Sequence, residues 1–166
     1  MSEVSDLKTK IKEWLTVDAL PFTETKNNYA DFQYVLSNAF GVGFVIDIAK
    51  PKNKPILAFA MQLKNPPQME QGFSSLDEVE KMKLLEGLKR ELLKLGVDYD
   101  ISDDMKVVTI IYHQYIEDIT HTLFMESLKL VRNASLIVIS ILSERFTSGI
   151  ASMPPHSHSE LNSPYG

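Results

Sequence analysis

Cysteine is absent from this chain of 166 residues. Its absence excludes a disulfide framework, a thiolate nucleophile and any cysteine-ligated zinc or iron–sulfur site. Positive charge is also in short supply, because 17 Lys and Arg face 22 Asp and Glu and leave a net charge of -5 at pH 7. Binding to nucleic acid needs a basic surface, so this balance argues against a nucleic-acid partner.

Long apolar runs are missing as well. The longest, Ala134 to Leu142, is interrupted by two serines, whereas a membrane-spanning helix needs about 20 predominantly apolar residues. The segment Met1 to Lys8 lacks the apolar core of a signal peptide. We therefore expect a cytoplasmic protein without a membrane partner. Apolar residues still make up 44% of the chain, which is enough for the core of one domain.

The composition changes near Thr147. Beyond this point the chain is rich in Ser and Pro and has no apolar periodicity, so it cannot bury enough apolar surface to offset the entropy of ordering. The sequence predicts a single domain over residues 1–147 and a disordered Ser/Pro/His tail over residues 148–166. His156 and His158 lie in this tail, where a solvated role is favoured over weak metal binding.

The first half of the domain has a helical pattern followed by three strand-like patterns. Apolar residues recur at helical spacing from Val4 to Leu15, and Ser2 or Ser5 is a candidate cap. Alternating apolar and polar residues predict strands; these strands cover Phe32–Leu36, Val42–Ile48 and Ile56–Leu63. Their short connections predict an antiparallel meander. Residues 22–28 are interpreted as a polar linker and 65–72 as a loop.

The second half begins with a strongly marked helix. Ser75-Leu-Asp-Glu78 matches a capping box, and Gly96 is a left-handed stop. One apolar stripe follows the helix between them; its residues are Leu76, Val79, Met82, Leu85, Leu88 and Leu92. Two further strands, Val97–Ile101 and Lys106–Tyr115, and a helix over about 120–146 complete the order α-β-β-β-α-β-β-α. This order predicts the α+β class, an antiparallel sheet with helices packed mainly on one face.

The final helix is apolar on more than one side. One predicted face carries Phe124, Leu128, Val131, Ser135, Val138 and Leu142. A second carries the candidate interface residues Leu123, Leu130, Ile137 and Ile141. The helix would be roughly 40 Å long, more than the width of a small domain. Either a kink near Asn133 or a subunit interface would account for the extra apolar face, and the interface is favoured.

The best candidate site for chemistry is the group His113, Glu117, Asp118 and His121. On one helix His113, Glu117 and His121 would share a face, as metal ligands do. The group spans the end of a predicted strand and the start of a helix, however, and acidic residues at a helix N-terminus are favoured by the helix dipole alone. A structural role is favoured, and a metal or acid–base role remains the alternative.

Three other polar groups are interpreted structurally. The aspartates between residues 98 and 104 lack the glycine and the distal glutamate of a calcium loop. Gly41 and Gly43 lack the third glycine and the following helix of a phosphate-binding loop, which favours a hairpin turn. The lysines at positions 50, 52, 54 and 64 are typical of a solvated turn that protects a sheet edge, with an anionic partner as the alternative.

The order of elements resembles the type III secretion chaperone-like architecture. The segments that carry the resemblance are the strand Phe44–Ile48, the capped helix Ser75–Leu95 with Gly96, and the strand Val107–Tyr112. More narrowly, the chain is similar over about 1–146 to an archaeal family of uncharacterised proteins, and the bacterial YbjN-like proteins have a similar plan. The resemblance implies a dimer that binds protein segments and has no active site.

The sequence therefore favours a non-enzymatic protein-binding or chaperone-like module, acting as a homodimer with a protein or peptide partner. We expect no catalytic residues, no bound metal and no cofactor. The alternative is a small metal- or ligand-binding enzyme that uses His113, Glu117, Asp118 and His121.

Overall fold

The computed structural model describes residues 3–41 and 43–147. The predicted tail with His156 and His158, and the Ser2 cap, lie outside the described residues. The described chain forms one antiparallel sheet and four helices, which confirms the predicted α+β class. No helix in this part of the chain is long and apolar enough to cross a membrane.

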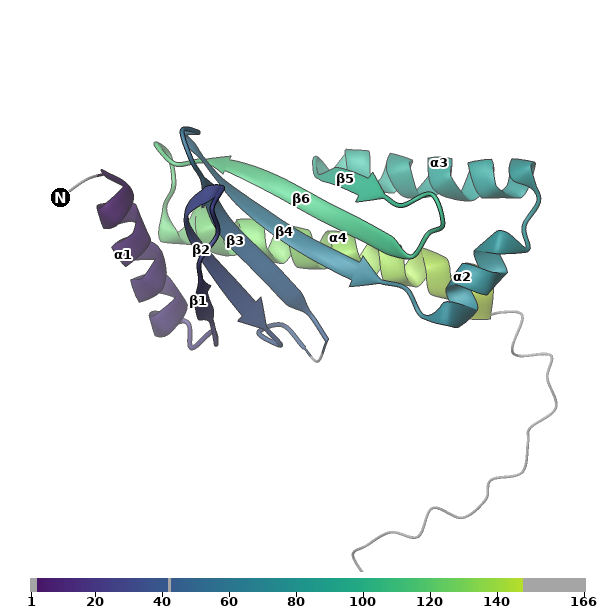
Figure 1. Cartoon of the computed structure of the whole chain (residues 1–166), viewed down its shortest axis with the longest axis horizontal. Helices are drawn as coiled ribbons and strands as arrows, with labels where there is room; N and C mark the ends of the chain where they lie inside the picture. The colour runs from purple at the N-terminus through teal and green to yellow at the C-terminus, as the bar shows by residue number, and fades with distance from the viewer. Residues whose placement is uncertain (1–2, 42, 148–166) are drawn as a thin grey trace, which may run out of the picture.

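Six strands form the sheet in the order β1-β2-β3-β4-β6-β5 (Figure 1). Every neighbouring pair is antiparallel. The strands are β1 (Thr23–Thr25), β2 (Ala30–Ser37), β3 (Val45–Pro51), β4 (Ile56–Lys64), β5 (Asp98–Ile101) and β6 (Val107–Tyr115). The two terminal strands of the sheet are also its shortest, which limits the exposed edges.

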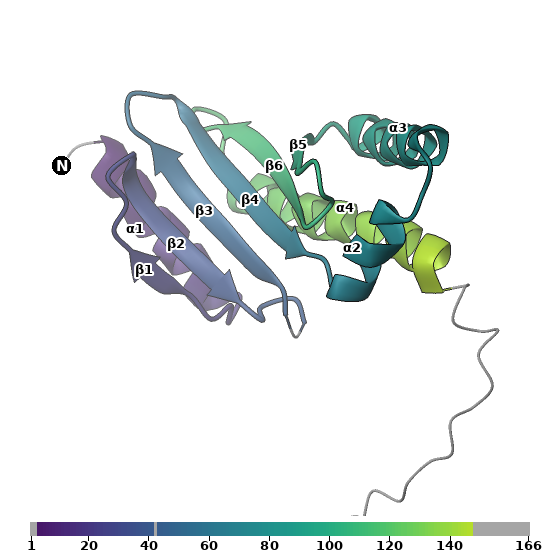
Figure 2. The same cartoon turned by 45° about the vertical axis from the view of Figure 1, so that its right-hand side comes forward.

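The two helices that lie against the sheet, the first and the last of the four, cover a single face of it. The four helices are α1 (Glu3–Val17), α2 (Pro67–Ser74), α3 (Glu78–Leu95) and α4 (His121–Thr147). In Figure 2 the sheet lies in front, with α1 behind its first strands and α4 behind β4 and β6. The shorter helix α2 and the helix α3 lie beyond the sheet, next to α4. Within residues 3–41 and 43–147, no helix covers the second face of the sheet.

The register of the strands fixes which side chains face the helices. Paired residues in antiparallel strands point to the same face, and the row Tyr34, Ile48, Phe59 and Tyr112 crosses four strands in this way. Tyr34, Ile48 and Phe59 are fully buried, and Tyr112 is partly buried against the core. The core therefore lies between this row and the helices.

The helix α1 is attached to the sheet by a narrow apolar stripe. Leu7, Ile11 and Leu15 recur every four residues and are all buried, as the helical repeat requires. Trp14 lies beside them and contacts Phe124 of α4, with 5.5 Å between the ring centroids. The first and the last helix of the chain thus share one core.

The helix α4 runs unbroken through Asn133 (Figure 1). The predicted core face is confirmed, because all six of its residues are buried; they are Phe124, Leu128, Val131, Ser135, Val138 and Leu142. Ser135 is accommodated in the core by donating a hydrogen bond to the Val131 carbonyl at 2.8 Å. A kink is therefore not needed to bury this face.

Several boundaries differ from the sequence-based expectation. The predicted linker contains β1, and the predicted loop at 65–72 contains most of α2. The strand predicted at Val42–Ile48 begins at Val45, because Gly41 and Gly43 have positive φ angles of 128° and 86° and belong to the turn before it. Val42 itself lies outside the described residues.

The start of α3 also differs. Asp77, rather than Ser75, is the N-cap, and its side chain accepts a hydrogen bond from the Glu80 amide at 2.8 Å. The predicted stop at Gly96 is confirmed, with a φ angle of 71° in the left-handed region.

Candidate functional site

The group predicted as a site for chemistry is separated in the structure. His113 lies on β6, and its Nδ1 is 3.3 Å from Oδ2 of Asp98 on β5. His121 begins α4, where it contacts the Asp18 carboxylate and stacks on Trp14 with 5.7 Å between the ring centroids. The two histidines thus have different carboxylate partners.

The acidic members of that group lie apart from both pairs. Glu117 and Asp118 are exposed in the connection between β6 and α4. Within residues 3–41 and 43–147, no three His, Asp or Glu side chains are gathered closely enough to hold a metal ion. The geometry of the group fits two separate histidine–carboxylate contacts.

The aspartates between residues 98 and 104 also serve local structure. Asp98 and Asp100 lie on β5, whereas Asp104 lies in the turn to β6. Hydrogen bonds from the Lys106 side chain and amide, and from the Ser102 hydroxyl, lower the pKa of Asp104 to about 2. This carboxylate stabilises a tight hairpin turn, in agreement with the structural interpretation of the cluster.

One of the predicted surface lysines is buried. Lys50 lies on the helix-facing side of β3 and is only 4% exposed. Its Nζ donates hydrogen bonds at 3.0 Å to Asp31 Oδ2 and to the Pro51 carbonyl. Lys52, Lys54 and Lys64 are exposed, as expected. The interpretation of all four as solvated is therefore wrong for Lys50.

The candidate interface residues on α4 are half-buried. Leu123, Leu130, Ile137 and Ile141 each have intermediate exposure. Leu130 and Ile141 pack against the core cluster, so part of this apolar face is used within the monomer. Two other residues of α4, Leu136 and Ile139, are more exposed, at 40% and 39%.

Apart from Val17 at the end of α1, the most exposed apolar side chains on the helices belong to α3. Val79 and Met82 are each 59% exposed and Leu93 is 64% exposed. The sequence placed Val79 and Met82 on the buried stripe, but the described part of α3 fully buries only Leu88 and Leu92. The reason is that α3 lies beyond the sheet (Figure 1), where only one side of the helix meets the core.

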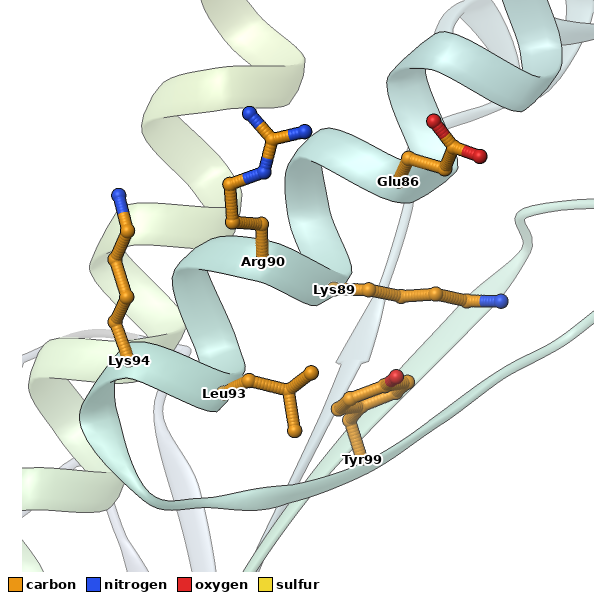
Figure 3. Close-up of a pocket in the computed structure, with 6 residues that line it drawn as sticks. All are labelled: Glu86, Lys89, Arg90, Leu93, Lys94 and Tyr99. Atoms are coloured by element: carbon orange, nitrogen blue, oxygen red, sulfur yellow. The ribbon is translucent and has the colours of Figure 1, made fainter.

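A shallow hollow of about 640 Å³ lies between α3 and β5. Figure 3 shows Leu93 pointing towards the ring of Tyr99, with Lys89 extended above that ring. Arg90 and Lys94 point away from Tyr99. The charged groups diverge rather than converge on a point, so this hollow lacks the arrangement that catalysis on a small substrate requires.

A second hollow, of about 600 Å³, lies where β3 and β4 diverge. The two strands pair only from Ile46–Met61 to Ala49–Ala58. In Figure 1 the end of β4 then runs away from the start of β3 towards α2. The residues that line the hollow are Gly43, Phe44, Val45, Asp47, Gln62, Leu63, Lys64, Asn65, Pro66, Met69 and Ile139.

Asp47 is the acidic residue of this second hollow. It lies on the uncovered face of the sheet, in register with Val35 and Ala60. Burial raises the pKa of its carboxyl above the ordinary value, and a hydrogen bond with the Gln33 side chain offsets part of that rise. Sequence reasoning missed this site, although an aspartate among the apolar residues of a predicted strand was a visible signal.

Solved structures of similar fold support the architecture. A crystal structure of an uncharacterized protein from Methanothermobacter thermautotrophicus aligns with a TM-score of 0.78 and 22% identity, over 84% of this chain and 99% of that chain. The crystal structure of the ExsC–ExsE complex aligns with a TM-score of 0.57 and 13% identity, over 83% of this chain and 95% of that chain. The resemblance in architecture that the element order implied is thus confirmed at the level of the fold.

A third similar structure is YbjN from E. coli, with a TM-score of 0.44 and 14% identity over 84% of this chain and 92% of that chain. No curated protein matches the sequence. A family model does match, from residue 7 to residue 142, which is most of the described domain. The chain therefore belongs to the family of uncharacterized conserved proteins designated DUF2299.

Proposed function

We propose that this protein is a non-enzymatic protein-binding module that acts as a homodimer in the cytoplasm. The observation that carries the proposal is the apolar surface of α3. Val79 and Met82 lie within one turn of each other, and Leu93 lies about three turns further along the same side of α3. Each of the three is more than half exposed, and exposed apolar side chains on one side of a helix favour a protein-interaction surface. We call these three residues the α3 patch.

The homodimer is proposed to form through α4. Leu123 and Ile137 have intermediate exposure and lie on one side of the helix, which they share with Leu130 and Ile141. Packing a second copy on this side would bury apolar area that the monomer leaves half-exposed, and burial contributes roughly 25 cal/mol per Å². The α3 patch then remains accessible to a different protein.

The fold similarity supports a protein partner. The ExsC–ExsE structure, which has a similar fold, is a complex between two proteins. The chemistry of the described residues points the same way, because His113 and His121 have separate carboxylate partners and the charges around Tyr99 diverge. Apolar surface, rather than a convergent polar site, is what the fold offers to a partner.

Light scattering at micromolar concentration tests the dimer. We expect a mass of twice 18.8 kDa for the wild type and a monomeric mass for the double variant Leu123→Glu/Ile137→Glu. The matched control is Met82→Glu/Leu93→Glu, which alters apolar residues of the α3 patch and is expected to remain dimeric. A monomeric wild type, or a dimer that only the control disrupts, would contradict the proposed interface.

Recovery of partners from the native host tests the α3 patch. We expect the wild type and the Leu123→Glu/Ile137→Glu variant to retain a specific protein that the Met82→Glu/Leu93→Glu variant does not. Circular dichroism verifies that each variant is folded. Equal recovery by all three proteins would assign the interaction to another surface.

A further inference from the structure

The hollow between β3 and β4 has free strand edges on both sides. Beyond the Ile46–Met61 pair the two strands separate. Each strand nevertheless keeps its other neighbour, because Val45 pairs with Ser37 of β2 and Lys64 pairs with Val107 of β6. In the described chain, therefore, the edges of Val45 on β3 and of residues 62–64 on β4 that face the hollow have no strand partner. The backbone of Phe44 is already bonded to Gly41 and Asn38 in the preceding turn.

Alternation along the strands shows that the hollow passes between them rather than above the sheet. Val45 and Asp47 of β3, with Gln62 and Lys64 of β4, belong to the uncovered face. Phe44 and Leu63 alternate with these residues and pack against the core on the helix side. Both sets line the same hollow, which is the environment that a strand inserted into a sheet would occupy.

The helix side of the hollow is apolar. Phe44, Leu63 and Met69 are partly buried against the core, and Ile139 of α4 is 39% exposed beneath them. An apolar side chain directed to this side from an inserted strand would cover all four residues. We call this side the floor of the cleft.

The side of the cleft that lies on the uncovered face of the sheet has one charged residue at each end. Asp47 lies at the inner end, beside the last paired residues, and Lys64 lies at the outer end of β4. Among the described residues no Lys, Arg or His forms an ion pair with Asp47. A partner with a basic and an acidic side chain, two positions apart on one face of a strand, would complement both charges.

We propose that the cleft between β3 and β4 binds an extended segment of a partner protein, which adds a short strand between them. The segment has a basic residue facing Asp47, an apolar residue on the floor and an acidic residue facing Lys64. Main-chain hydrogen bonds to both free edges supply affinity, and the alternating side chains supply specificity. The inference rests on the proposed protein-binding function and gives that function a second site.

Two short peptides test the proposal, because the added strand can run in either direction between β3 and β4. They are acetyl-Thr-Arg-Val-Glu-Thr-amide and the same peptide with Arg and Glu exchanged. Each is titrated at pH 7.5 into the full-length ¹⁵N-labelled protein and followed by amide chemical shifts. One of the two is expected to bind at least tenfold more tightly than a peptide with Gln at both charged positions, with shifts concentrated at residues 43–47 and 62–65. Shifts concentrated elsewhere would overturn the assignment.

The contribution of the main chain is tested with an N-methylated central valine. This change keeps every side chain but removes one N–H donor, so binding is expected to fall at least tenfold. Equal binding of the methylated peptide would mean that side chains alone are recognised, and would rule out strand addition.

Matched variants locate the site. Asp47→Asn is expected to weaken binding of the charged peptide about tenfold and to leave binding of the Gln peptide unchanged. The control is Asp100→Asn, at an exposed aspartate on the same face of the sheet, which is expected to leave binding of both peptides unchanged. Ile139→Ser is expected to weaken binding of both peptides. Its control, Leu136→Ser, changes a residue of nearly the same exposure on the same helix and is expected to weaken binding of neither. Equal effects within either pair would contradict the site.

This experiment does not depend on the dimer. None of the cleft residues belongs to the α4 interface or to the α3 patch. Light scattering on the same samples reports the oligomeric state, so a monomer that still binds the peptide overturns only the dimer. A dimer that ignores the peptide overturns only the cleft.

Discussion

A single residue shows how closely side-chain roles depend on register. The sequence placed Lys50 in a solvated turn, but β3 extends past the predicted end at Ile48 to Pro51. Lys50 therefore lies within the strand, in register with Phe32, on the face that the helices cover. Its charge is tolerated there because the Asp31 carboxylate and the Pro51 carbonyl accept hydrogen bonds from its ammonium group. Lys50 continues the buried alternation of Ile46 and Ile48, so the sequence-based interpretation was wrong only because it ended the strand at Ile48.

Asp31→Asn is predicted to destabilise the fold by about 1–3 kcal/mol, because it leaves the buried Lys50 ammonium without its counter-charge. Urea denaturation at pH 7 measures the effect. The control is Glu24→Gln, which removes the partner of Lys8 in an exposed pair and is expected to cost less than about 1 kcal/mol. Equal losses of unfolding free energy in the two variants would show that the buried Lys50–Asp31 pair contributes no more to stability than the exposed Lys8–Glu24 pair.

Tyr34 links stability to alkaline pH. Burial, together with the negative charge of Glu24, raises the pKa of its phenol to about 12. An unfolded tyrosine ionises near pH 10, so the neutral phenol contributes stability below pH 10 that is lost as the pH rises towards 12. The predicted loss is at most about 3 kcal/mol.

The variant Tyr34→Phe isolates this effect, because it keeps the ring in the core and removes the ionisable group. The difference in unfolding free energy between wild type and variant should shrink or change sign from pH 9.5 to pH 11.5, in favour of the variant. A difference that stays constant over this range would refute the assigned pKa direction.

At the scale of elements, periodic segments were predictable and short ones were not. The repeats of α1, α4 and the long strands identify them from the sequence alone. β1 has only three residues and no periodic pattern, and it forms because its backbone pairs with β2. α2 begins after Pro66 with Pro67 in its first turn, and proline at this position is a helix-start signal that the loop interpretation overlooked.

The contact between α2 and α4 depends on a glycine. A Cβ at Gly72 would lie 2.6 Å from Cδ1 of Phe146 on α4. Gly72→Ala is therefore predicted to push the ring away and to destabilise the protein by about 1–3 kcal/mol, despite the gain in helix propensity. The measurement is the urea midpoint of the full-length protein.

Gly87→Ala provides the opposite expectation within α3. A Cβ at this position meets nothing within 4 Å, so alanine should stabilise the helix by about 0.5–1 kcal/mol. Opposite signs at Gly72 and Gly87 support the close approach of α2 and α4, whereas stabilisation by both substitutions would refute it.

At the scale of the whole molecule, one continuous core joins elements from both ends of the chain. The buried cluster runs from Leu7 of α1 to Leu142 of α4. Its position followed from the sequence, because the amphipathic faces were predicted. The candidate sites could not be predicted from the sequence. The exposure of the α3 patch depends on α3 lying beyond the sheet, and the cleft depends on the position at which β3 and β4 separate.

The shared core predicts cooperative unfolding. Trp14, the single tryptophan of the chain, lies on α1 against Phe124 of α4, so its fluorescence reports on the contact between the two ends. Urea transitions followed by Trp14 fluorescence and by far-ultraviolet circular dichroism are expected to coincide. A fluorescence transition at lower urea would mean that α1 separates before the sheet unfolds.

Because β3 and β4 separate, the interior of the sheet has unpaired backbone groups, which are normally found only on its two terminal strands. Along the last three residues of β4, backbone groups bonded to β6 alternate with groups that face the cleft. In deuterated water, neighbouring amides of this central strand should therefore exchange at very different rates, slowly where β6 protects them and rapidly where the cleft admits solvent. A sheet of six strands thus carries two more edges than its strand order indicates, and a bound segment would slow exchange at both.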